Sequence, residues 1–277
     1  TTMTPRTTDA EPAEGDVPHV RVAIVGTGFT GLAMVHALRE AGIEDWLVLE
    51  KSPGVGGVWR DNTYPGIACD VPSYLYSLSF APNPDWERTF SSGGQIWEYE
   101  ERVARELRIA EKTWFGEELV DGRWDAARSC WHLTTTTRRL TAQFVVDGSG
   151  VLGAPKLPDI PGIEDFQGTL FHSARWNHAE SLAGKRVAVI GTGASAIQIV
   201  PAIQPEVERL TVFQRTAGWV IPRNDRDVTA VERRILRRIP FLQKLIRGGQ
   251  YVYRDAFLLQ VMHRPAVRRF AEAVSKA

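Results

Sequence analysis

The segment HVRVAIVGTGFTGLAMVHALREAGIEDWLVLEK, residues 19–51, decides the fold. Its apolar run Val20–Val25 predicts a buried strand, and a glycine-rich turn follows that run directly. Apolar residues near helical spacing come next and predict a helix that ends at Gly42. Because Trp46–Glu50 then has the pattern of another strand, the segment predicts a β-α-β unit of a parallel sheet.

The turn of this unit has the pattern G-x-G-x-x-G, formed by Gly26, Gly28 and Gly31. In such a turn the first glycine allows the tight turn, the second lets the backbone approach a pyrophosphate, and the third allows close packing of helix on strand. Glu50 ends the next strand, where its carboxylate can accept hydrogen bonds from both ribose hydroxyls. The pattern favours a dinucleotide site that suits FAD. The alternative is a structural turn beside a solvent-facing glutamate.

A second segment, KRVAVIGTGASAIQIVPAIQPEVERLTVFQRT at residues 185–216, repeats this design with the turn G-x-G-x-x-A. Gln214 stands where the first unit has its acid, and Arg215 follows it. No carboxylate repels a 2′-phosphate there, and a guanidinium can pair with it bidentately, so the second site is expected to prefer NADPH. An Arg215 that only caps a surface strand is the alternative. The residues expected at NADPH are Gly191, Thr192, Gly193, Ser195, Ala196, Arg215 and Thr216.

Between and after these units the sequence is less regular. Pro53–Trp86 is rich in Gly, Pro, Tyr and Ser and predicts a long ordered loop, whereas Gly94–Arg108 has helical periodicity. Short runs within Thr113–Val146 predict a small antiparallel meander that returns to a parallel strand. Val151–Asn177 is typical of a connector, and the C-terminal remainder predicts amphipathic, basic helices.

We therefore expect an α/β fold with two Rossmann-like dinucleotide-binding domains, the second incomplete, a small antiparallel β-meander and a helical C-terminal segment. The basic helices are expected to pack beside the NADPH domain, with contact to an anionic membrane surface as the less favoured alternative. The expected division is a disordered tail at 1–18, an FAD-binding domain at 19–150, an interdomain linker at 151–182, and the N-terminal part of an NADP-binding domain with a basic helical insertion at 183–277.

Composition excludes several classes of protein. With 43% hydrophobic and 24% charged residues and a formal net charge of +0, the chain is typical of a soluble globular protein and gives no argument for binding nucleic acid. No run approaches the ~18 apolar residues of a membrane span. Only Cys69 and Cys130 occur, without the spacing of a disulfide framework or a zinc site, so we expect a reduced, cytoplasmic compartment and no metal.

Residues between the two turns resemble a known family, the Baeyer-Villiger monooxygenases, which are class B flavoproteins. The matching stretch comprises Gly56-Gly57-Val58-Trp59, Asn62, Tyr64-Pro65-Gly66, Cys69-Asp70, Pro72-Ser73, Tyr76 and Ser79-Phe80. The connector is similar to the family fingerprint F-x-G-x-x-x-H-x-x-x-W, and its matching residues are Phe166, Gly168, His172 and Trp176. Asn177 departs from the Pro or Asp that follows in the strict fingerprint, and the resemblance covers roughly residues 19–225.

The resemblance implies roles for individual residues. It assigns Glu50 to the FAD ribose, Val120 to the adenine side, and Ser149 and Gly150 to a short return to FAD in which Gly148 replaces the usual Ala. It assigns Gly57, Val58, Trp59 and Tyr76 to the surroundings of the flavin. Asp70 is the implied catalytic residue, because in the family this acid lies beside the flavin ring and pairs with an active-site arginine, here expected beyond Ala277.

The chemistry implied by the resemblance is oxygen insertion. NADPH reduces FAD, O2 gives a flavin C4a-peroxide, and attack on a ketone followed by rearrangement yields an ester or lactone. One alternative is a related enzyme that oxygenates nitrogen or sulfur. Another is a truncated fragment that binds nucleotides without turnover. His172 and Trp176 are expected to couple the two domains rather than to transfer protons, and Cys69 to be a small buried residue rather than a redox thiol.

Overall fold

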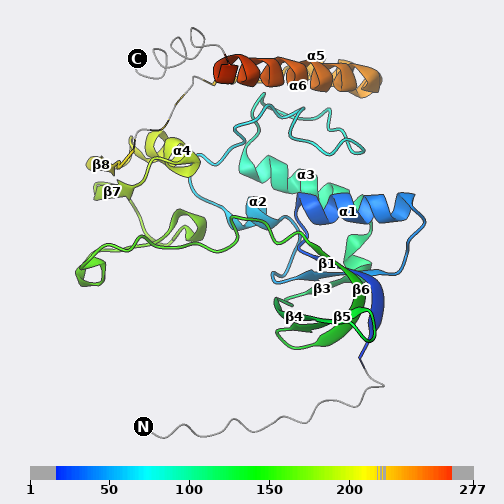
Figure 1. Cartoon of the computed structure of the whole chain (residues 1–277). Helices are drawn as coiled ribbons and strands as arrows, with labels where there is room; N and C mark the ends of the chain where they lie inside the picture. The colour runs from blue at the N-terminus through cyan, green and yellow to red at the C-terminus, as the bar shows by residue number, and fades with distance from the viewer. Residues whose placement is uncertain (1–16, 217, 219, 221–222, 264–277) are drawn as a thin grey trace, which may run out of the picture. The chain divides into compact units, whose positions relative to one another are not determined.

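The computed structural model describes residues 17–216, 218, 220 and 223–263 (Figure 1). Within these residues the chain divides into two compact units. The first is formed by residues up to Val55 and by Ala104–Val151, and the second by Gly56–Val103 and the residues from Leu152 onward. The predicted disordered tail, residues 1–18, lies outside the described residues except for its last two.

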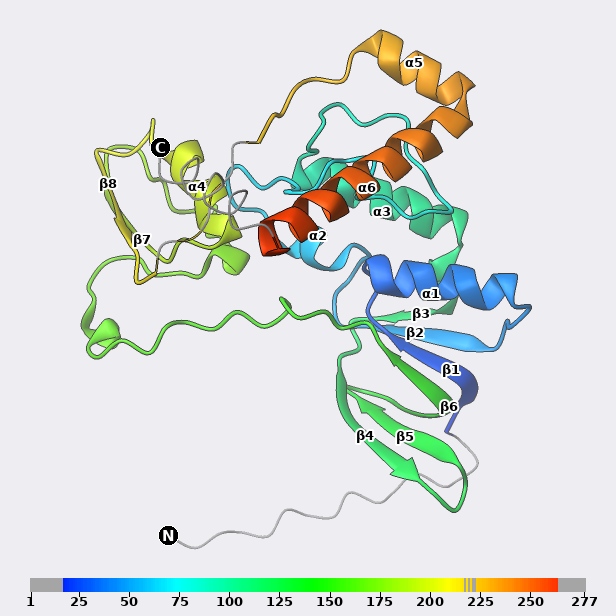
Figure 2. The same cartoon turned by 45° about the horizontal axis from the view of Figure 1, so that its top comes forward.

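The first unit contains a mixed six-stranded sheet in the order β3-β2-β1-β6-β5-β4, which can be followed in Figure 2. β1 pairs in parallel with β2 and β6, β2 pairs in parallel with β3, and β4, β5 and β6 are antiparallel neighbours. The strands are β1 His19–Val25, β2 Trp46–Glu50, β3 Thr113–Phe115, β4 Leu119–Asp125, β5 Cys130–Thr135 and β6 Arg139–Asp147. The predicted β-α-β unit is confirmed, with helix α1 at Phe29–Glu40 between β1 and β2.

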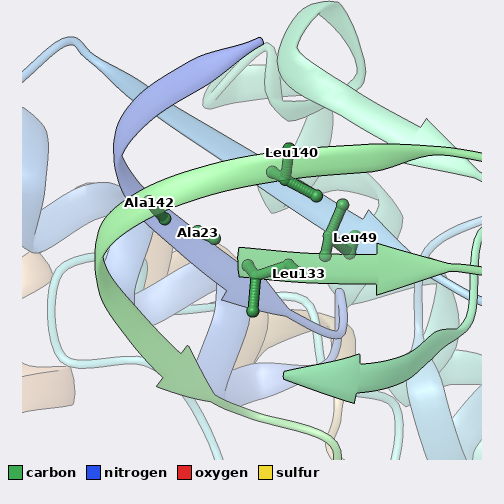
Figure 3. Packing of buried hydrophobic residues seen from close by; sticks show 5 residues of the cluster. All are labelled: Ala23, Leu49, Leu133, Leu140 and Ala142. Carbon is green, nitrogen blue, oxygen red and sulfur yellow. The ribbon is translucent and has the colours of Figure 1, made fainter. Parts of the chain in front are cut away.

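The predicted meander is part of this same sheet rather than a separate layer. The core cluster in Figure 3 takes Ala23 from β1, Leu49 from β2, Leu133 from β5, and Leu140 and Ala142 from β6, and each of these side chains is almost fully buried. Because parallel and antiparallel strands contribute to one apolar cluster, the sheet folds as one element.

The strand register of the first unit brings three chain segments to one edge of the sheet. Val25 at the end of β1 is paired with Leu49 of β2 and with Asp147 of β6. The glycine turn, Glu50 and Gly148 follow these positions directly. The carboxyl ends of parallel strands are where ligands bind in open α/β sheets, so the register places the candidate residues at that edge.

The second unit contains a smaller sheet and most of the helices. β7 and β8 are parallel, Ile190 is paired with Phe213, and α4 connects the two strands. A buried cluster of Tyr64, Ile199 and Ile203 packs α4 against the loop that follows α2. The elements are α2 Gly57–Asp61, α3 Gly93–Glu106 (which continues into the first unit), β7 Arg186–Ile190, α4 Ala194–Ile203, β8 Arg209–Phe213, α5 Ala230–Arg238 and α6 Pro240–His263, with 3-10 turns at Ile109–Lys112 in the first unit and Ile163–Asp165 and Ser173–Arg175 in the second.

Three segments whose local structure was expected from the sequence can be compared with the observed helices. The expected loop Pro53–Trp86 contains the short helix α2, and the helix expected at Gly94–Arg108 is α3. The expected basic helices are α5 and α6, while residues 264–277 lie outside the described part. None of the helices in the described part is long and apolar enough to cross a membrane.

The two units do not coincide with the domain boundaries expected from the sequence. Gly56–Val103 groups with the second unit, whereas the division 19–150, 151–182 and 183–277 places it in the FAD-binding domain. Contacts within a unit do not report which cofactor a residue binds. The expected domain division therefore stays a prediction.

Candidate dinucleotide and flavin sites

Two glycines of the first turn are required by its geometry. Gly26 has φ +90°, and a Cβ on it would lie 2.7 Å from the backbone oxygen of Gly148. A Cβ on Gly31 would lie 2.1 Å from the backbone oxygen of Gly26. Gly28, by contrast, has φ −76° and ψ −167°, an extended conformation that any residue adopts. The turn therefore needs glycine at its first and third positions for reasons of backbone packing.

The N-terminus of α1 is open to an anion. No side chain caps it, and its first turn contains no acidic residue. The first N–H groups of a helix have no partner within the helix and carry partial positive charge. Such an uncapped end, preceded by a glycine turn, fits the pyrophosphate of a dinucleotide.

Glu50 is buried, with 4% of its surface exposed, at the end of β2. One carboxylate oxygen accepts hydrogen bonds from Thr27 N (2.9 Å) and Thr27 Oγ1 (2.6 Å), and the other accepts from Ser52 N (2.9 Å). A carboxylate has about four acceptor positions, so these bonds fix its orientation and leave about one position for a ligand hydroxyl. The burial contradicts the alternative of a solvent-facing glutamate.

The segment that returns after β6 lies against the first turn. A Cβ on Gly148 would lie 2.7 Å from the backbone oxygen of Val25, so this close approach requires glycine here. Ser149 donates its N–H to Asp147 over 3.0 Å, and the hydrogen bonds from the Ser149 side chain and backbone lower the pKa of Asp147. Gly150 follows with φ +75°.

Val120 lies elsewhere in the first unit. It is 60% exposed on β4, and β6 and β5 separate β4 from β1 in the sheet. The structure therefore brings Ser149 to the first turn but does not bring Val120 to it. The assignment of Val120 to the adenine side stays a prediction.

The second turn is more open than the first. Gly191 has φ +108°, and among the described residues no atom would lie within 4 Å of a Cβ on Gly191 or on Gly193. Gly193 is the N-cap residue directly before α4, whose N-terminus again lacks a side-chain cap and an acidic first turn. Thr192 lies between the glycines, and Ser195 and Ala196 lie in the first turn of α4. This end of α4 also fits a pyrophosphate.

The residues that distinguish the second site lie at the end of β8. Gly191 N donates to Phe213 O over 2.9 Å, so the turn and the end of β8 are adjacent. Gln214 donates from its side chain to Thr216 O over 3.3 Å. Arg215 and Thr216 are exposed, and within the described residues Arg215 makes no hydrogen bond or ion pair. Its guanidinium is thus available to a phosphate.

The predicted flavin-side residues of the second unit form a pair of aromatic rings. Trp59 Nε1 donates to Tyr76 OH over 3.0 Å, and their ring centroids are 5.5 Å apart at 79°. Burial raises the pKa of Tyr76 to about 12, although the hydrogen bond from Trp59 opposes this rise. Tyr76 is therefore a neutral hydrogen-bonding group at ordinary pH.

The start of α2 explains the Gly-Gly pair before Val58. Gly56 has φ +120°, and a Cβ on it would lie 2.4 Å from Trp97 Cδ1. Gly57 has φ +46°, and Val58 O accepts hydrogen bonds from the backbone and side chain of Asn62. Both glycines are thus needed by conformation or close packing.

Asp70 lies in a loop whose backbone is flanked by arginines. Arg223 Nη1 donates to Cys69 O over 3.1 Å, and Arg254 Nη2 donates to Asp70 O over 3.5 Å. The Asp70 carboxylate is exposed and has no hydrogen bond or ion pair within the described residues. Burial raises the pKa of Cys69 to about 11, which agrees with an inert buried thiol.

Sequence reasoning missed Gln198, which ties α4 to the loop before Asp70. Its side-chain oxygen accepts from Tyr64 OH (3.1 Å) and Ala68 N (3.2 Å), and its side-chain nitrogen donates to Ala68 O (2.8 Å). Gly66, at φ +80°, allows the close approach, since its Cβ would lie 2.6 Å from Gln198 O. No sequence spacing signals a contact between positions so far apart.

The four predicted fingerprint residues are held by local contacts. His172 Nδ1 accepts a hydrogen bond from Ala174 N at 3.0 Å and so caps a 3-10 turn. Trp176 packs edge-on against Phe171, with ring centroids 5.2 Å apart, and also against the Tyr64 cluster. Phe166 is exposed and lies against Gly168. These contacts support a structural role for His172 rather than proton transfer.

Comparison with known proteins gives consistent matches. The model of the flavin-binding monooxygenase-like family (FMO-like) matches residues 19–247. A Baeyer-Villiger monooxygenase of Streptomyces coelicolor is 50% identical over 258 residues, which are 93% of this chain and 50% of that protein. An open crystal structure of cyclohexanone monooxygenase matches with TM-score 0.74 and 34% identity over 80% of this chain and 45% of its own. A crystal structure of OTEMO in complex with FAD and NADP matches with TM-score 0.74 and 31% identity, covering 80% and 44%.

The matches cover most of this chain but only part of each relative. The chain spans about half the length of the proteins it matches. The solved structures share its α/β fold with the Rossmann-like mixed sheet. Because the family model matches most of its residues, the chain belongs to the flavin-binding monooxygenase-like family, and its similarity to Baeyer-Villiger monooxygenases confirms the resemblance that its motifs predict.

Proposed function

We propose that this chain is the nucleotide-binding part of a monooxygenase that uses FAD and NADPH to insert one oxygen atom of O2 next to a ketone carbonyl, giving an ester or lactone. One observation carries the proposal. Two similar glycine turns end beside groups of opposite charge, the buried Glu50 and the exposed Arg215. A carboxylate suits ribose hydroxyls, whereas a guanidinium suits the 2′-phosphate of NADPH. The first turn is therefore suited to FAD and the second to NADPH.

The first turn fits FAD in three respects. The uncapped N-terminus of α1 accepts the pyrophosphate, and the absence of side chains at Gly26 and Gly31 keeps the turn tight. Glu50 is held in place by Thr27 and Ser52, so it meets a ribose hydroxyl without reorganising. On the resemblance, Ser149, Gly150 and Val120 complete this site.

The second turn fits NADPH. We assign β7, α4 and β8 to the N-terminal part of an NADP-binding Rossmann-like domain, with the pyrophosphate at Gly191–Ala196 and the 2′-phosphate at Arg215 and Thr216. The OTEMO structure, which contains FAD and NADP, supports a site for each cofactor in this fold.

Bound FAD supplies the redox chemistry that takes electrons from NADPH and activates O2. On the resemblance, Gly57, Val58, Trp59, Asp70 and Tyr76 surround the flavin. Trp59 and Tyr76 form a hydrogen-bonded pair that provides a neutral, apolar boundary. Asp70 offers an exposed carboxylate that orients a cationic group beside the ring.

The test is a product analysis. The full-length protein of which this chain is the nucleotide-binding part is loaded with FAD and incubated with NADPH, air, a cyclic ketone and a thioether, and residues 1–277 alone are treated in the same way. The proposal predicts a lactone, a loss of about tenfold or more in kcat for Asp70→Asn with FAD still bound, and no change for the exposed control Asp159→Asn. Sulfoxide as the sole product would favour the heteroatom-oxygenating alternative. Cofactor binding by residues 1–277 without any product would support the fragment alternative for this chain alone, whereas the absence of product from the full-length protein would overturn the proposal.

A further inference from the structure

Helix α6, drawn in orange to red in Figure 2, forms hydrogen bonds with the loop that carries Asp70 and Tyr76. Arg247 Nη1 donates to three backbone oxygens of this loop, those of Tyr74 (3.3 Å), Leu75 (3.0 Å) and Ser77 (2.6 Å). Farther along the helix, Arg254 Nη2 donates to Asp70 O over 3.5 Å. One helix thus binds the loop 70–77 near both of its ends.

The two arginines lie on the same face of α6. They are about two helical turns apart, since a turn has about 3.6 residues. The connection between α5 and α6 is stabilised by Gln243 in the first turns of α6, which is buried and donates from its side chain to Leu236 O of α5 over 3.0 Å. A rigid element therefore presents both guanidinium groups.

The loop needs a cation at this place. Leu75 N and Tyr76 N both donate to Pro72 O, which closes a tight turn. The carbonyls of Tyr74, Leu75 and Ser77 converge on Arg247 at its end. Converging carbonyls carry partial negative charge, as at the C-terminus of a helix, and a guanidinium neutralises it. Without the cation the carbonyls would repel one another or turn toward water.

The same loop holds the residues to which the proposed function assigns the flavin side. Tyr76 closes the turn with its backbone N–H, and its hydroxyl accepts the hydrogen bond of Trp59. Cys69 N is fixed to Ser91 O over 2.8 Å, and Asp70 follows it. A change in the backbone between positions 70 and 77 therefore moves both Asp70 and the Tyr76 ring.

We infer that Arg247 and Arg254 are positioning residues, which hold the loop 70–77 from α6 and thereby set the places of Asp70 and Tyr76. The roles of Asp70 and Tyr76 at the flavin rest on the proposed function. The evidence that α6 binds the loop is independent of that function and consists of the hydrogen bonds of Arg247 and Arg254. Arg247 is half-buried and donates to carbonyl oxygens of the protein. This arginine of the basic helices therefore binds the loop 70–77 and is not available to an anionic membrane surface.

The experiment compares Arg247→Ala, Arg254→Ala and Arg247→Lys with the matched control Arg238→Ala. Arg238 is an exposed arginine in the last turn of α5, without a hydrogen bond or ion pair among the described residues. The first readout is the alkylation rate of Cys69, resolved by mass spectrometry, with the buried Cys130 of the first unit as internal reference. It requires no bound flavin.

We expect Arg247→Ala to raise the alkylation rate of Cys69 about tenfold or more relative to that of Cys130. The loop loses its hydrogen bonds to a charged group, so it opens more often and exposes the thiol. Arg254→Ala should raise the Cys69 rate less, because it removes a single longer hydrogen bond and because the lost positive charge no longer lowers the pKa of Cys69. Arg247→Lys should restore part of the protection, because an ammonium still donates to carbonyls. The second readout is the absorbance spectrum of bound FAD, which should shift in Arg247→Ala and not in Arg238→Ala.

A Cys69 rate in Arg247→Ala equal to that of Arg238→Ala would overturn the inference. So would a raised rate with an unchanged flavin spectrum, because the loop would then not position the flavin side. If the wild-type chain binds no FAD, the proposed function fails, and the Cys69 rates alone decide whether α6 holds the loop. If Arg247→Ala also exposes Cys130, the protein has unfolded, and Arg254→Ala, which removes a single hydrogen bond, decides.

Discussion

Replacing Glu50 by glutamine should destabilise the first unit even without a cofactor. The carboxylate accepts from Thr27 N, Thr27 Oγ1 and Ser52 N. An amide of the same size has only one oxygen, so its NH2 group must face either Thr27 N or Ser52 N, and two donors then meet. The Thr27 hydroxyl can reverse its role, but a backbone N–H cannot.

The size of the effect follows from these contacts. At least one hydrogen bond from a buried N–H to a charged group is lost, which costs about 2–3 kcal/mol. No cavity forms, because Gln and Glu have nearly the same volume. For a protein of this size about 1 kcal/mol corresponds to a shift of roughly 2–4 °C in Tm, so Glu50→Gln should lower the Tm by roughly 4–12 °C.

The assay is thermal unfolding of the apoprotein, followed by circular dichroism. The control is Glu40→Gln, which alters an exposed glutamate at the end of α1 and should leave the Tm unchanged. A Tm of Glu50→Gln within ~1 °C of the wild type would show that the three hydrogen bonds do not stabilise the turn, and that they do not fix the Glu50 carboxylate for a ribose hydroxyl.

Three further predictions follow from single residues. Gly31→Ala should yield no folded protein on purification, because its Cβ would lie 2.1 Å from the backbone oxygen of Gly26; a variant with the wild-type Tm would contradict this. Cys69 alkylation, followed by mass spectrometry, should accelerate until the pH approaches a pKa of about 11, and a plateau near pH ~9 would be inconsistent with its burial. Hydrogen bonds from Arg226 and the backbone lower the pKa of Glu232 from 4.5 to about 2, so its stabilisation of α5 is present above pH 4.5 and is lost as the pH falls toward 2. The protection factors of amides in the first turn of α5, measured by hydrogen exchange, should fall as the pH drops through that range, and unchanged factors at its acid end would contradict this prediction.

Local patterns predicted those parts of the fold that depend on neighbours in sequence. The strand, turn and helix around Gly26 follow from hydrophobic periodicity and glycine spacing, and the structure has them within a residue or two. The capping box of Thr229 and Glu232 at the start of α5 is another local signal of this kind, although only the helix was predicted.

Contacts between distant positions could not be predicted in this way. Gln198, Arg223 and Arg247 each bind backbone oxygens of the segment 68–77, more than a hundred residues earlier in the chain. A guanidinium that binds carbonyls leaves no motif, because every residue has a carbonyl and arginines are common on basic helices. The sequence therefore predicts the basic helices, but the loop that they hold is visible only in the structure.

The most direct test of the central claim is coenzyme discrimination by the second turn. Titration calorimetry on the FAD-free chain, in which no flavin can be reduced, compares NADPH with NADH in the wild type, in Arg215→Ala and in the control Arg209→Ala at the opposite end of β8. We expect the wild type and Arg209→Ala to bind NADPH about tenfold or more tightly than NADH, and Arg215→Ala to lose this preference. Equal affinities of the wild type for the two coenzymes, or a preference that survives in Arg215→Ala, would show that Arg215 does not select the phosphorylated coenzyme.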